Sequence, residues 1–184
     1  IMENELMSKQ YFWKIFGKTN IQKSDKKFID LQDEMPSDLN KKMTLIYSND
    51  FESDSSLVIS QASSGKRSIV LNKEKQVSNE IYISILPTQK GYYRAVVKAY
   101  PNEKEWNSWM QTQWIIGLYC KNKEVKTNFY RVHRIIEPGS WQEISIDIKT
   151  LKNEPSDQLR IKFWNANSEK QIQFDDLKVY FAPY

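Results

Sequence analysis

The sequence is poor in the residues that build cross-links and metal sites. Its 184 residues include one cysteine, Cys120, and one histidine, His133. A single cysteine excludes an internal disulfide and a metal site built from cysteines. The chain is nevertheless long enough to bury a hydrophobic core of useful size.

Long apolar runs are absent as well. No stretch approaches the ~18 apolar residues of a membrane-spanning helix, and no signal peptide is recognisable at the start. The chain begins at Ile1 instead of an initiator methionine, which favours a piece of a larger protein or a processed chain. We expect no membrane span in this fragment.

An excess of charge of one sign is also missing. The chain carries 27 Lys and Arg against 23 Asp and Glu, a formal net charge of +4. These charges are dispersed along the sequence, whereas proteins that bind nucleic acid usually gather basic residues on one face. Nucleic acid is therefore not an expected partner.

Aromatic residues, in contrast, are abundant. The chain contains 8 Phe, 6 Trp and 10 Tyr, which together make up 13% of its residues. This is more than a core of this size needs. Some of these side chains are therefore available to face a ligand.

Alternating apolar and polar residues dominate the last third of the chain, from Trp141 to Tyr184. Period-two alternation is typical of strands with one face on a core, and turn residues separate the runs. The spacing predicts an antiparallel β-sandwich instead of a βαβ fold. A hairpin is expected at 121–123, and the expected strands are about nine: 44–52, 66–71, 80–85, 92–100, 113–120, 125–136, 141–148, 159–164 and 171–181.

The first 42 residues lack this alternation. We divide the chain into an N-terminal extension or linker (1–42) and a sandwich domain (43–184). Apolar residues around Phe12–Phe16 predict a short helix that Gly17 ends. Two interpretations stay open for it: a helix that covers one apolar end of the sandwich, and a helix that docks on a membrane surface or a partner.

Four short motifs, taken in order, resemble those of a known family. They are Asn49-Asp50-Phe51-Glu52, Ala62-Ser63-Ser64-Gly65-Lys66-Arg67-Ser68, Gly139-Ser140-Trp141, and the closing run Ile172–Val179. They resemble the jelly-roll carbohydrate-binding modules of the galactose-binding-domain-like superfamily. The resemblance implies an all-β jelly-roll sandwich in which the first and last strands pair.

The same resemblance implies a structural calcium ion. Pairing of the first and last strands would bring together carboxylates that repel one another unless a cation neutralises them, and oxygen ligands suit calcium. The alternative is that Lys66 and Arg67 neutralise these carboxylates without a metal. The predicted calcium ligands are Asp50, Glu52, Asp175 and Asp176.

Catalytic motifs are not recognisable. His133 has no carboxylate motif beside it, and Cys120 follows an apolar run in which an inert buried thiol is the simpler interpretation. Glu103 and Glu105 share one loop, so a pair of carboxylates across a cleft has no visible partner. Gly65-Lys66 lacks the flanking residues of a phosphate loop. We therefore do not expect an enzyme.

The predicted ligand-binding residues are aromatic side chains with polar neighbours. Flat aromatic rings stack on the C–H faces of sugars. Two tryptophans lie in a polar loop between expected strands, with further candidates on outer strand faces. The alternative is that Trp106 and Trp109 fill one end of the sandwich and that Trp164 belongs to a structural turn. The full set is Trp106, Trp109, Tyr100, Arg94, Asn107 and Trp164.

These observations predict a non-catalytic carbohydrate-binding-like module within a larger exported or envelope protein. Its expected partners are a glycan and neighbouring domains of the same chain. Its expected location is extracellular, periplasmic or in the cell envelope. The alternative function is a structural or protein-interaction sandwich that binds no sugar.

Overall fold

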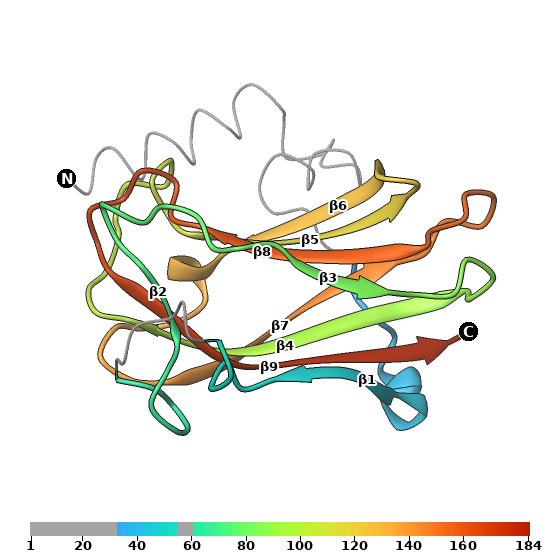
Figure 1. Cartoon of the computed structure of the whole chain (residues 1–184), viewed down its shortest axis with the longest axis horizontal. Coiled ribbons are helices and arrows are strands. Elements are labelled where there is room, and N and C mark those ends of the chain that lie inside the picture. The colour runs from blue at the N-terminus through green and yellow to red at the C-terminus, as the bar shows by residue number, and fades with distance from the viewer. Residues whose placement is uncertain (1–32, 55–60) are drawn as a thin grey trace, which may run out of the picture. The chain divides into compact units, whose positions relative to one another are not determined.

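Two antiparallel sheets face each other in the computed structural model, which describes residues 33–54 and 61–184 (Figure 1). The predicted all-β jelly-roll sandwich is thereby confirmed. The described residues contain nine strands: β1 (Thr44–Asn49), β2 (Ile69–Leu71), β3 (Ile81–Ser84), β4 (Gly91–Pro101), β5 (Gln113–Cys120), β6 (Lys123–Arg131), β7 (Gln142–Lys149), β8 (Gln158–Trp164) and β9 (Ile172–Pro183).

The strand order makes β9 the centre of one sheet. That sheet has the order β1-β9-β4-β7, and β2 also pairs with β9. The opposing sheet has the order β3-β8-β5-β6. The first and last strands pair as expected, with Ser48 opposite Lys178 and Asn49 opposite Leu177. Within the described residues, no helix is both long and apolar enough for a membrane span.

The core forms where the apolar faces of the two sheets meet. On β4, the alternate residues Tyr93, Ala95, Val97 and Ala99 are fully buried, as the period-two pattern predicted. Aromatic rings join the sheets: Phe163 of β8 stacks on Phe174 of β9, with ring centroids 4.0 Å apart. Burying a side chain of this size stabilises the fold by roughly 2–3 kcal/mol.

The hairpin between β5 and β6 follows from its two turn residues. Lys121 has φ 49° and Asn122 has φ 65°. A two-residue hairpin turn of this class requires positive φ at both positions, and asparagine adopts that conformation more readily than most residues. The prediction of a hairpin at 121–123 is confirmed.

The expected strand 125–136 is too long. β6 ends at Arg131, and the chain then forms the short 3-10 helix η3 (Val132–Arg134). The Val132 carbonyl accepts bonds from the amides of Ile135 and Ile136, and this turn buries both Val132 and Ile136. Apolar residues along the sequence do not distinguish this turn from a continued strand.

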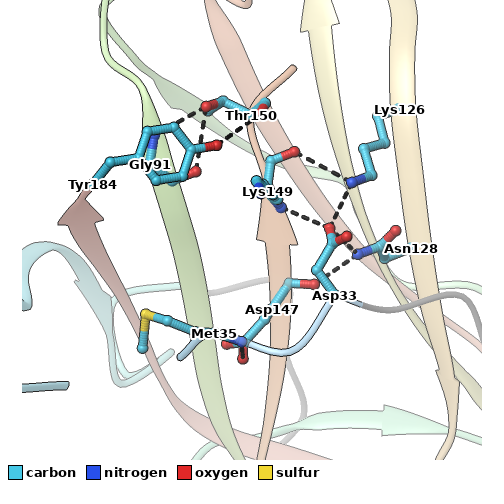
Figure 2. A network of polar contacts seen from close by, with 9 residues as sticks. All are labelled: Asp33, Met35, Gly91, Lys126, Asn128, Asp147, Lys149, Thr150 and Tyr184. Carbon is cyan, nitrogen blue, oxygen red and sulfur yellow. Dashed lines mark hydrogen bonds and ion pairs between the residues drawn. The ribbon is translucent and has the colours of Figure 1, made fainter. Parts of the chain in front are cut away.

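Residues 33–42 belong to the same compact unit as the sandwich. Asp33 Oδ2 accepts bonds from Lys126 Nζ at 2.6 Å, Asn128 Nδ2 at 3.1 Å and the Lys149 amide at 2.7 Å (Figure 2). Lys126 and Asn128 lie on β6, whereas Lys149 lies on β7 of the other sheet. One carboxylate therefore joins the two sheets. The helix expected at Phe12–Phe16 lies outside the described residues.

The helix η2 (Ser37–Lys42) covers part of the five-stranded sheet. Met35 and Leu39 pack on Tyr92 and Ala182. This sheet is tightly packed at Gly91, where an added Cβ would lie 2.1 Å from the Ala182 carbonyl oxygen. Glycine is therefore required at position 91 because the backbones approach so closely.

Candidate functional site

The loop between β4 and β5, residues 102–112, presents two tryptophans to solvent; we call it the tryptophan loop. Trp106 is 70% exposed and Trp109 is 82% exposed. The alternative that these residues fill one end of the sandwich is therefore wrong. Large apolar side chains at neighbouring exposed positions often mark a binding surface.

A buried carboxylate holds the base of this loop. Glu105 is buried, and its side chain accepts bonds from Ser168 Oγ at 2.6 Å and from the Asn107 amide at 2.9 Å. Its backbone carbonyl accepts a bond from Gln111 Nε2 at 3.0 Å. These bonds tie the loop to the β8–β9 connection and close it on itself. The loop is thus fixed at its base and open at its tip.

His133 continues this buried network. Its Nδ1 accepts a bond from the Glu105 amide at 3.4 Å, so the ring proton is assigned to Nε2, which lies 3.2 Å from Thr112 Oγ1. The Thr112 hydroxyl then donates to Asn165 Oδ1 at 2.6 Å. Burial lowers the pKa of His133 to about 4, although the Glu105 carboxylate acts in the opposite direction. His133 is therefore a packed, neutral residue.

Asn107 shapes the tip between the two indoles. Its Oδ1 accepts a bond from the Trp109 amide at 3.1 Å, and its carbonyl accepts one from the Met110 amide at 2.9 Å. Asparagine commonly stabilises such turns through its own side chain. Asn107 therefore orients the backbone that carries Trp109.

Tyr100 and Trp164 lie near the two ends of the tryptophan loop, on different sheets. Tyr100 precedes it on β4, where its ring packs against Trp141 with centroids 5.6 Å apart. Trp164 is half-buried at the end of β8 and pairs with Gln113, which directly follows the loop. Both residues are at the same end of the sandwich as the exposed tryptophans.

Arg94 does not share this site. Its guanidinium donates to Asp147 Oδ1 at 2.7 Å and Oδ2 at 2.8 Å, and to Asn40 Oδ1 at 2.9 Å. It lies on the first half of β4, whereas the tryptophan loop follows the last residue of that strand. The expectation that Arg94 shares one binding region with the tryptophans and Asn107 is therefore wrong. Arg94 instead forms a structural ion pair with Asp147.

Sequence reasoning missed the residues that support the loop. Ser168 lies 63 positions from Glu105, and Asn165 lies 53 positions from Thr112. The sequence predicts a turn at 165–168, but it does not indicate that this turn contacts the tryptophan loop. These partners emerge only when β8 and β5 pair.

Three of the four carboxylates predicted to bind calcium, Glu52, Asp175 and Asp176, contact the turn at residues 63–67. Asp175 is fully buried, and its Oδ2 accepts bonds from the amides of Ser63 at 2.7 Å and Ser64 at 3.0 Å. Desolvation raises the pKa of Asp175, while these amide donors act to lower it. The last strand is thereby pinned to this turn.

Glu52 approaches the same turn from the segment after β1. Its Oε1 accepts bonds from the amides of Arg67 at 2.7 Å and Lys66 at 2.8 Å, and these bonds lower the pKa of Glu52. Gly65 has φ 65°, and an added Cβ would lie 2.4 Å from the Glu52 carboxylate. Glycine at position 65 therefore permits both the turn and the close carboxylate.

Asp50 and Asp176 complete the expected ligand set. Asp176 bonds Ser64 Oγ at 2.7 Å and pairs with Lys98 at 3.0 Å, while Asp50 Oδ1 accepts the Glu52 amide at 3.2 Å. The oxygen donors suit calcium, but no group of three or more His, Cys, Asp or Glu side chains able to hold a metal occurs within 33–54 and 61–184. The fit is thus partial, and calcium stays a prediction.

If calcium binds here, chelation will lower the melting temperature and added Ca²⁺ will restore it. A ligand that binds only the folded state adds about 2.7 kcal/mol when present at about 100 times its Kd. Differential scanning fluorimetry with EDTA, Ca²⁺ and Mg²⁺ measures this effect. Glu52→Gln serves as the matched variant and should lose the response. Identical melting curves under all conditions would exclude the ion.

Comparisons with known proteins add similarity in fold alone. No family model and no curated protein matches this chain. A solved structure titled "Family 16 Carbohydrate Binding Module-2" aligns with 67% of this chain and 82% of its own, at 14% identity and TM-score 0.48. A second solved structure, titled "Xylan-Binding Domain from CBM 22, formally x6b domain", aligns with 75% of this chain and 95% of its own, at 12% identity and TM-score 0.44.

Similar structures also include an enzyme. A cyclase from Fischerella sp. TAU aligns with 74% of this chain and 73% of its own, at 9% identity and TM-score 0.46. At these identities the similarity does not assign a ligand or an activity. The functional argument therefore rests on the described side chains.

Proposed function

We propose that the sandwich domain is a non-catalytic carbohydrate-binding module whose glycan stacks on Trp106 and Trp109. The observation that carries this proposal is their exposure, 70% and 82%, on a loop whose base is fixed by the buried Glu105 carboxylate. Leaving an indole in water forgoes roughly 2 kcal/mol of burial free energy. Two such residues on one loop suit a surface that a ligand covers.

The anchoring of the loop supports binding as well. A loop that is already ordered loses little further conformational freedom when a ligand arrives. Sugar rings present C–H faces to flat aromatic rings, and their hydroxyl groups bond to neighbouring polar side chains. Asn107 between the indoles, and the Glu103–Lys170 pair at the root of the loop, supply such groups.

The wider context of this proposal is a larger exported or envelope protein. In that setting the module would hold the protein on a glycan outside the cytoplasm, while neighbouring domains perform the chemistry. The polar residues at the base of the loop support binding better than catalysis because they are buried and bonded to one another.

The Trp106→Ala and Trp109→Ala variants should each weaken glycan binding about tenfold or more, because each stacked ring contributes roughly 1.4 kcal/mol or more. Their folds should stay intact since both side chains are exposed. Affinity gel electrophoresis against a panel of soluble polysaccharides, followed by calorimetry on any that retard the protein, measures the loss. Leu86→Ala is the matched control: Leu86 is also exposed but precedes β4, at the opposite end of that strand.

Two outcomes would contradict this proposal. One is a glycan that retards the two tryptophan variants as strongly as the unmodified chain. The other is no retardation by any polysaccharide. In the second case, the alternative function as a protein-interaction domain would account for the exposed indoles.

A further inference from the structure

A hollow lies on the side of the sandwich, where the edge strands β1 and β3 of the two sheets face each other. Its volume is about 290 Å³, and its lining includes Tyr47, Asn49, Phe51, Glu80 and Tyr82. None of its lining residues belongs to the tryptophan loop. Neither the sequence motifs nor the proposed function assigns a role to this pocket.

The floor of the pocket is rigid and apolar. Phe51 and Ile69 are buried in the main core, and Ile81 packs against it. Phe51 has φ 61°, an uncommon conformation for a bulky residue. A bond from its amide to Asn49 Oδ1 at 2.8 Å holds this conformation. The floor is therefore formed before any ligand arrives.

One lining residue, Tyr82, carries an aromatic ring that is held in place yet open to solvent. Tyr82 is 56% exposed, and the Arg160 guanidinium lies 5.0 Å from its ring centroid and 4.0 Å from that of Tyr119. Arg160 itself donates to Gln158 at 2.6 Å and to Asn122 at 2.5 Å. This cation–π arrangement orients Tyr82 without covering it fully.

Polar groups with remaining bonding capacity line the same pocket. The Tyr47 hydroxyl accepts a bond from Asn49 Nδ2 at 3.2 Å, which leaves its proton able to donate. Glu80 lies 3.7 Å from both Arg160 and Lys162, so these ion pairs are too long to be hydrogen bonds. Glu80 also accepts a hydrogen bond from the Tyr82 phenol, and this bond raises the pKa of Tyr82. Because a carboxylate has about four acceptor positions, Glu80 can still accept further hydrogen bonds from a ligand.

The rim of the pocket is anchored to β8. The Ser78 amide donates to the Phe163 carbonyl and the Phe163 amide donates to Ser78 Oγ, each at 3.0 Å. The Asn165 amide donates to the Gln76 carbonyl at 2.7 Å. The connection between β2 and β3 is thereby held in place. Ligand binding would therefore cost little conformational entropy in this segment.

We propose that this pocket binds one neutral pyranose ring, with a C–H face on Tyr82 and hydroxyl groups on Glu80 and Tyr47. The volume of about 290 Å³ is at the small end of ligand pockets, which suits a single ring or a chain terminus. The lining carries two carboxylates, Asp54 and Glu80, and one ammonium group, Lys75, so it has no excess of positive charge to attract an anionic ligand. The proposal does not depend on sugar binding at the tryptophan loop.

The test is a titration of the isotopically labelled full chain, followed by NMR. The probes are the methyl glycosides of glucose, galactose, mannose and xylose, with glucuronate as an anionic comparison. At least one neutral glycoside should shift the amide resonances of residues 78–82. The Tyr82→Ala and Glu80→Gln variants should weaken that binding about tenfold or more. Trp106→Ala should leave it unchanged, which separates this site from the tryptophan loop.

Tyr47→Phe keeps the assay decisive if a larger change disturbs the fold. It removes one hydroxyl group and should weaken binding about threefold to tenfold, since one neutral hydrogen bond contributes roughly 1 kcal/mol. No shift with any neutral glycoside would overturn the proposal. Equal binding by the Tyr82→Ala variant would also overturn it, as would tighter binding of glucuronate.

Discussion

The Asp147→Ala variant is expected to lose about 3 kcal/mol of folding free energy, a large part of the stability of a domain of this size. Asp147 is buried on β7 and accepts two bonds from the Arg94 guanidinium. It also accepts the Met35 amide at 2.9 Å. Removing it leaves a half-buried cation and a buried backbone donor without their partner.

Urea unfolding followed by circular dichroism measures this loss. Glu169→Ala is the matched control because Glu169 and Lys73 form a salt bridge in which both side chains are about two-thirds exposed. That variant should unfold at nearly the same urea concentration as the unmodified chain. The double variant Arg94→Met with Asp147→Ala should recover part of the loss, since no unpaired cation remains. A loss no larger than that of the control would show that the Arg94–Asp147 pair contributes little.

Acidification is expected to destabilise the domain through His133. Its pKa is about 4 in the fold and 6.5 in an unfolded chain. Between these values the unfolded chain binds a proton that the folded protein does not, so stability falls as pH decreases from 6.5 to 4. The full difference corresponds to roughly 3 kcal/mol.

His133 is the one histidine of the sequence, so no other imidazole titrates in this window. The groups facing it are Glu105, which raises its pKa, and Lys104, which lowers it. His133→Gln keeps a donor for Thr112 without a proton to titrate. The stability advantage of the unmodified chain over this variant should shrink steadily from pH 6.5 to pH 4. A constant difference across that range would contradict the assigned pKa.

The same acidification should affect the tryptophan loop. His133 bonds the Glu105 amide and the Thr112 hydroxyl, which lie near the two ends of the loop. Protonation of Nδ1 removes the acceptor for the Glu105 amide. The loop that carries Trp106 and Trp109 therefore depends on a neutral histidine at its base.

The strand pattern is the part of this protein that the sequence determines alone. Leu159, Ile161 and Phe163 alternate with Arg160, Lys162 and Trp164, and the first three are fully buried. A strand places alternate side chains on opposite faces, so the period of the sequence indicates which residues form the core. The turn at Lys121-Asn122 is likewise encoded locally, by residues that accept positive φ.

The predicted site residues were separated by tertiary structure. Arg94, Tyr100 and Trp106 are close in sequence, but Arg94 is paired with Asp147, 53 positions away on β7. Alternation places Arg94 on an outer face but does not indicate what covers that face. Residues 33–42, which have no strand pattern, supply Met35 and Asn40 there.

The exposure of the tryptophans was decided in the same way. An indole in a polar loop can fill the end of a sandwich or face solvent, and the sequence around Trp106 and Trp109 is compatible with both. The loop turns outward because Glu105 occupies the buried position and bonds Ser168, 63 positions later. Local periodicity thus determined the sheets and their core, whereas contacts between distant segments decided which polar groups are buried and which aromatic rings remain available to a ligand.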